Sequence, residues 1–139
     1  MSKRDLISAI SVIVISLVIV LYPSQKGPRP CDINQKGGCT VSGVTFSIEP
    51  RPVRAMRENV FRVKLANQSL VPENSDLALH LTMPGMDMGT NRMRLKNIQP
   101  GWYSGKGVIP RCPSGNKLWR ASILDISARE IAAFHFEVE

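Results

Sequence analysis

The chain has 139 residues and a formal net charge of +7, with 18 lysine and arginine residues against 11 acidic ones. This length is enough for one domain with a modest core. The basic residues are scattered and no aromatic-basic motif accompanies them, so the charge does not indicate nucleic-acid binding. It is typical of a basic surface that faces solvent, an anionic membrane or an acidic partner.

The N-terminus carries a candidate membrane segment. Lys3 and Arg4 precede an uncharged run from Leu6 to Tyr22. At about 1.5 Å per residue this run spans roughly 26 Å, close to a hydrocarbon core of about 30 Å. A cleaved signal peptide is the alternative, but no small-x-small cleavage site follows the run. We therefore expect a signal anchor or transmembrane helix over residues 1–22, with the rest of the chain outside the cytoplasm.

Residues 23–38 are rich in Pro, Gly, Lys and Gln, which predicts a flexible linker before a domain over residues 39–139.

The chain has three cysteines and none forms a CxxC pair, so one disulfide and one free thiol in an oxidising compartment are expected. We favour a disulfide that includes Cys112, because pairing it with Cys39 closes the longer loop. Pairing of Cys31 with Cys39 is the alternative. The remaining thiol has three open roles, as a metal ligand, a docking residue or a free cysteine.

The exported part alternates short β-type runs with turn signals. Period-two patterning without an amphipathic helix predicts an all-β, immunoglobulin-like β-sandwich of about seven strands, preceded by the one N-terminal transmembrane helix. The expected strands are Val44–Ile48, Val60–Leu65, Leu77–Met83, Met93–Leu95, Tyr103–Ile109, Leu118–Leu124 and Ile131–Val138.

A methionine-rich turn follows the third expected strand. Met83, Met86 and Met88 surround Pro84-Gly85. Thioether sulfur is a soft ligand that prefers Cu(I) to hard cations and needs no deprotonation. Strand alternation places Met83 on the core face, so it is shared between core and site, whereas Met86 and Met88 point the same way if the segment is extended. These three sulfurs are the predicted metal ligands, and a turn that packs against a partner protein is the alternative.

Other residues are weaker candidates for a functional site. His80 and His135 are interpreted as ordinary strand histidines, Met93 as packing, and Trp102 as packing or as a cover for a cation. No Ser/His/Asp arrangement, paired-carboxylate motif or phosphate-binding glycine loop is present. We therefore expect no catalytic residues and no enzymatic activity.

The chain resembles the YtkA-like/FixH-like family. The resemblance rests on the anchor, on Met83-Pro84-Gly85-Met86-Asp87-Met88-Gly89, and on the later Gly101-Trp102-Tyr103-Ser104-Gly105 and Trp119-Arg120-Ala121. It implies a bacterial inner-membrane, single-pass protein with an immunoglobulin-like domain in the periplasm, or a secreted domain if the signal is cleaved. It also implies copper handling and an association with cytochrome oxidase assembly. Many relatives end the turn in Met-Gly-His, whereas Asp87-Met88-Gly89 replaces it here, which favours all-sulfur Cu(I) binding over Cu(II).

Three functions follow from these expectations. The first is copper(I) binding by a membrane-tethered periplasmic protein, for delivery, buffering or oxidase assembly, with a copper transporter or a haem-copper oxidase subunit as partner. The second is a metal-free interaction or assembly module of a membrane complex. The third is a structural envelope domain without a ligand.

Overall fold

A computed structural model describes residues 30–139 of the chain. The predicted anchor, residues 1–22, and residues 23–29 of the predicted linker lie outside the described residues. Within residues 30–139, no helix is both long enough and apolar enough to cross a membrane.

The described residues form an all-β domain of eight antiparallel strands, so the predicted fold class is confirmed at this level. Each of the seven expected strands is present. The additional strand is β1, whose three residues are too few to show a period-two pattern. The strands are β1 (Cys39–Val41), β2 (Val44–Glu49), β3 (Glu58–Leu65), β4 (Leu77–Thr82), β5 (Arg92–Gln99), β6 (Trp102–Val108), β7 (Leu118–Leu124) and β8 (Glu130–Glu137), with a short 3-10 turn, η1 (Gln68–Leu70), between β3 and β4.

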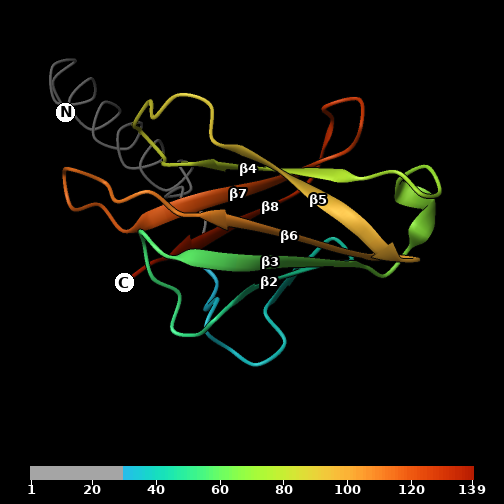
Figure 1. Cartoon of the computed structure of the whole chain (residues 1–139), viewed down its shortest axis with the longest axis horizontal. Helices are drawn as coiled ribbons and strands as arrows, with labels where there is room; N and C mark the ends of the chain where they lie inside the picture. Colours follow the sequence, from blue (N-terminus) through green and yellow to red (C-terminus); the bar gives the residue numbers. More distant parts are fainter. Residues whose placement is uncertain (1–29) are drawn as a thin grey trace, which may run out of the picture.

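The strands follow the order β1-β2-β3-β6-β5-β4-β7-β8 in one strongly curved sheet. Strand β5 connects its two halves: residues 92–95 pair with β4, and residues 96–99 pair with β6, with a register shift between Asn97 and Gln99. In Figure 1, β5 accordingly crosses obliquely from the side of β4 to the side of β6. The sheet is nearly closed, because β1 and β8 also approach each other.

The core lies between the two halves of the curved sheet. Alternate residues of β2, β4 and β8 are buried, as the sequence pattern predicts. The Phe46 ring of β2 lies 5.2 Å from Phe134 and 6.0 Å from Phe136, both on β8, so the second and last strands share one aromatic cluster. Burying each such side chain contributes roughly 1.5–3 kcal/mol to the free energy of unfolding.

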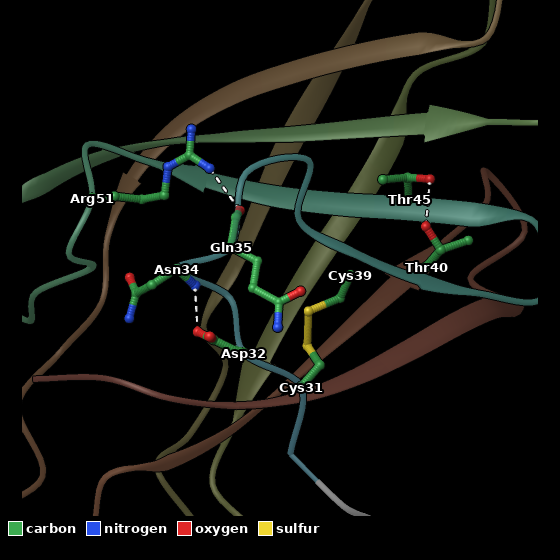
Figure 2. The surroundings of a disulfide bond; sticks show 8 residues. All are labelled: Cys31, Asp32, Asn34, Gln35, Cys39, Thr40, Thr45 and Arg51. Atoms are coloured by element: carbon green, nitrogen blue, oxygen red, sulfur yellow. Dashed lines mark hydrogen bonds between the residues drawn. A yellow bond between two sulfur atoms is a disulfide. The ribbon is translucent and has the colours of Figure 1, made fainter.

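The segment before β1 is fastened to the domain rather than extended from it. Cys31 forms a disulfide with Cys39, and the Cys31 amide donates a 2.6 Å hydrogen bond to the carbonyl of His135 on β8. The Ile33 side chain is 1% exposed and belongs to the core. The Arg51 guanidinium donates to the Gln35 carbonyl at 2.7 Å, as Figure 2 shows. The described part of the predicted linker, residues 30–38, is therefore packed against the sandwich.

The predicted disulfide was wrong. Cys112 is the free cysteine, and the bond joins Cys31 to Cys39. The entropy of loop closure favoured pairing Cys39 with Cys112, but the fold determines which thiols lie close enough to form a bond. Residues 31–38 bring Cys31 against β8 next to β1, whereas Cys112 lies in the connection between β6 and β7.

Candidate metal centre

Two connections meet at one end of the sandwich. The methionine turn joins β4 to β5, and residues 109–117 join β6 to β7. Because β4 and β7 are antiparallel neighbours, with Thr82 opposite Arg120, the chain leaves β4 beside the point where it enters β7. Figure 1 shows both connections extending from the same end of the molecule.

The methionine turn is tight and polar on its outer side. The Met86 amide donates to the Met83 carbonyl at 3.2 Å, which closes a turn around Pro84 and Gly85. Gly85 has a φ of 78°, a conformation that glycine adopts without strain. Asp87 then accepts a 2.9 Å hydrogen bond from the Gly89 amide through its carboxylate. These local bonds determine where the following sulfur atoms lie.

The three predicted ligand methionines occupy different environments. Met83 is 2% exposed and is part of the core, which confirms its placement on the core face of its strand. Met88 is half-buried and packs against the core. Met86 is 36% exposed and lies at the surface of the turn. Of the three, Met86 has the thioether that a metal ion or a partner protein reaches most directly.

A thiol lies beneath Met86. The Cys112 side chain is 5% exposed, and its S–H group donates to the Met86 sulfur with an Sγ–Sδ distance of 3.5 Å. The Ser114 hydroxyl lies 3.0 Å from the same thiol sulfur. The structure therefore pairs a free thiol with a predicted ligand methionine 26 residues earlier in the chain.

The loop after Cys112 stabilises the anionic form of its thiol. Hydrogen bonds from the Ser114 hydroxyl and from the backbone amides of Ser114, Asn116 and Gly115 lower the pKa of Cys112 below its ordinary value. Burial acts in the opposite direction and is the second-largest influence. A thiolate is the form of cysteine that binds metal ions. The local electrostatics of this loop thus suit a metal ligand.

The sequence left three possible roles for the unpaired cysteine, and it did not predict that Cys112 lies next to the methionine turn. The missing information was the strand order, because only the adjacency of β4 and β7 brings residue 112 to the methionine turn. The loop itself carried a usable signal. Cys112-Pro113-Ser114-Gly115-Asn116 combines a sulfur with turn-forming residues and a serine hydroxyl two positions later.

The other candidates stay apart from this sulfur pair. His80 lies on the outer face of β4, opposite the core face that holds Leu79 and Leu81. Among the described residues its Nε2 atom is buried without a hydrogen-bond partner, which an ordinary surface histidine would not show. Met93 packs close to Gly107 of β6, in agreement with its predicted packing role. Trp102 lies beneath the Lys64 ammonium, 5.0 Å from the ring centre, so a lysine of the chain already occupies that ring face.

Within residues 30–139, no three His, Cys, Asp or Glu side chains gather in a way that could hold a metal ion. The soft donors that the fold brings together are the Cys112 thiol and the Met86 thioether. Such donors suit Cu(I), which prefers thiolate and thioether, and do not suit Mg²⁺ or Ca²⁺, which prefer oxygen.

Fold and site together define an all-β domain with a thiol and thioethers at one end. No family model, curated protein or solved structure matches the chain.

Proposed function

We propose that the chain is a membrane-tethered periplasmic copper(I)-binding protein whose methionine-rich turn supplies Met83, Met86 and Met88. The observation that carries the proposal is the position of Met86, which is 36% exposed and yet has its sulfur 3.5 Å from a buried thiol. Two soft donors at a surface-accessible point are the chemistry that Cu(I) prefers.

The compartment and the anchor rest on the sequence. The uncharged run from Leu6 to Tyr22 is long enough to span a bilayer. The Cys31–Cys39 disulfide is typical of an oxidising compartment. The resemblance to the YtkA-like/FixH-like family supports a bacterial inner membrane and an immunoglobulin-like domain on its periplasmic side.

Delivery or buffering requires that copper can leave the site. A half-exposed ligand such as Met86 can be replaced by a donor from a second protein, one bond at a time, whereas a fully enclosed site cannot exchange in this way. A copper transporter or a haem-copper oxidase subunit is the partner class that this chemistry fits. We therefore assign the chain a carrier role, because an exposed thioether ligand suits copper exchange between proteins.

The test is a Cu(I) titration of the full chain in detergent micelles against a chromogenic Cu(I) chelator. We expect one copper ion per chain, and weaker binding in a Met86→Leu/Met88→Leu variant because leucine keeps the volume and removes the sulfur. Met56→Leu is the matched control, since Met56 is 63% exposed and lies outside the turn.

Unchanged affinity in the double variant, or no binding by the wild-type chain, would refute the copper role. The metal-free interaction module then gains support if the same double variant, without copper, loses a partner that copurifies with wild-type membranes. That alternative rests on the same exposed thioether, because methionine also forms adaptable contacts at protein interfaces.

A further inference from the structure

The free thiol and the exposed thioether come from two connections that the fold brings together. Cys112 belongs to the β6–β7 connection and Met86 to the β4–β5 connection, and their sulfur atoms are 3.5 Å apart. A buried thiol beside a sulfur that faces solvent is a pair of soft donors with one open side.

The distance fits a shared metal ion. Metal–thiolate bonds measure about 2.3 Å for zinc, and two sulfur ligands at that length and a tetrahedral angle lie roughly 3.8 Å apart. The observed 3.5 Å separation is within a few tenths of an ångström of this value. A metal ion would need only a small outward movement of Met86, which is the exposed partner.

The hydrogen bonds around Cys112 leave one direction free for a metal. Ser114 Oγ lies 3.0 Å from the sulfur, on a loop whose Gly115 amide donates to the Cys112 carbonyl at 3.1 Å. The thiol proton points at Met86. Loss of this proton leaves a thiolate whose remaining lone pair faces the Met86 sulfur.

We propose that Cys112 is the anionic ligand of the copper site and that Cu(I) binds between Cys112 Sγ and Met86 Sδ as a mixed thiolate–thioether centre. This inference rests on the proposed copper function and names its ligand set. On binding, the Cys112 S–H bond breaks, its proton leaves to solvent, and a sulfur–copper bond forms without any change of oxidation state. The metal takes the place of the proton between the two sulfurs. Copper enters past Met86, because Cys112 is 5% exposed.

The test uses the full chain in micelles, with Cu(I) and with Ag(I) as a redox-silent probe. Changing a group that only supports a metal ligand costs about 10–100-fold in affinity, so loss of a ligand should cost at least about tenfold. We therefore expect Cys112→Ser to weaken binding by about tenfold or more and to abolish the ultraviolet absorption of metal–thiolate charge transfer. Met56→Leu is the control, because Met56 is 63% exposed, lies outside the methionine turn and leaves Cys112 and Met86 unchanged, so both the affinity and the absorption band should be retained.

A second measurement needs no variant and covers the case in which Cys112→Ser fails to fold. Cys112 is the free thiol of the chain, so a maleimide reports on it alone. Stoichiometric Ag(I) should slow its alkylation in the wild-type protein, and Met86→Leu should reduce this protection. If the wild-type chain binds metal but shows no charge-transfer band and no protection, Cys112 is not a ligand while the copper function stands. If the wild-type chain binds neither metal, both proposals are wrong.

Discussion

Met86 and Cys112 differ in exposure although their sulfurs are in contact. The thiol is almost fully enclosed, while the thioether has about a third of its surface in solvent. An enclosed thiol reacts only slowly with bulky reagents, whereas the proposed small soft cation would reach it past the exposed partner. This asymmetry distinguishes the pair from core packing, in which both side chains would be enclosed.

His135 is expected to make the free energy of unfolding depend on pH. Burial lowers its pKa below the ordinary value of 6.5, with a further contribution from the positive charge of Arg120, and Glu130 opposes both. A histidine whose pKa is lower in the folded state binds fewer protons there than in the unfolded state. The free energy of unfolding is therefore at its full value above pH 6.5 and falls as the pH drops through the pKa of the folded state.

We expect His135→Gln to flatten this decline between about pH 7 and about pH 5, because glutamine does not titrate. Urea unfolding of both proteins across this range measures the effect. Asp76 and Asp125 also have lowered pKa values, but their ordinary value is 3.8, so they act at lower pH. Parallel pH profiles for the two proteins would show that His135 has no such role.

At the scale of elements, period-two patterns predicted β2, β4 and β8 because each of these strands has one buried face. Strand β4 alternates without exception, and its predicted range differs from the observed one by a single residue. Strand β5 was predicted too short. It changes partners halfway along, and only Leu95 among its residues is fully buried, so its second half, including the exposed Ile98, has no alternation to detect.

The segment before β1 could not be predicted from composition. Its Pro, Gly, Lys and Gln residues resemble a linker, but Ile33 enters the core and the segment carries its own hydrogen bonds. One example is the Val53 amide, which donates to the Asn34 side-chain oxygen at 3.0 Å. Such contacts depend on residues far along the chain, which local patterns do not contain.

Gly38 provides the test of this packed segment. A Cβ atom at Gly38 would lie 2.1 Å from the Phe46 carbonyl oxygen of β2, and its φ is +72°. Gly37 has a φ of +98° and open space around its Cα. We expect Gly38→Ala to lower the free energy of unfolding by about 3 kcal/mol or more, because backbone must move, and Gly37→Ala by about 1 kcal/mol, from conformational strain alone.

Chemical denaturation of the two variants and the wild-type protein gives the comparison. Equal destabilisation by the two substitutions would mean that residues 30–38 are not held against β2. In that case the composition-based interpretation of the segment as a linker would be the better description.

For the whole molecule, the fold decides which of the predicted ligands can act together. The sequence predicted the methionine turn as a soft-metal site, which is still a prediction, and it favoured a disulfide that includes Cys112 over the observed Cys31–Cys39 pairing. Cys31 lies against Phe136 of β8 and forms its disulfide with Cys39 of β1, and the third cysteine lies in the β6–β7 connection, beside the Met86 sulfur. The strand order thus determines which two cysteines form the disulfide and which one keeps a free thiol.

The central claim is that copper(I) binds to sulfur at this end of the domain. X-ray absorption at the copper edge, recorded on the full chain loaded with one Cu(I), tests it most directly. We predict a first coordination shell of sulfur atoms alone, which loses a scatterer in Cys112→Ser. A shell of nitrogen or oxygen atoms, or a sulfur shell unchanged in both Cys112→Ser and Met86→Leu, would contradict the account.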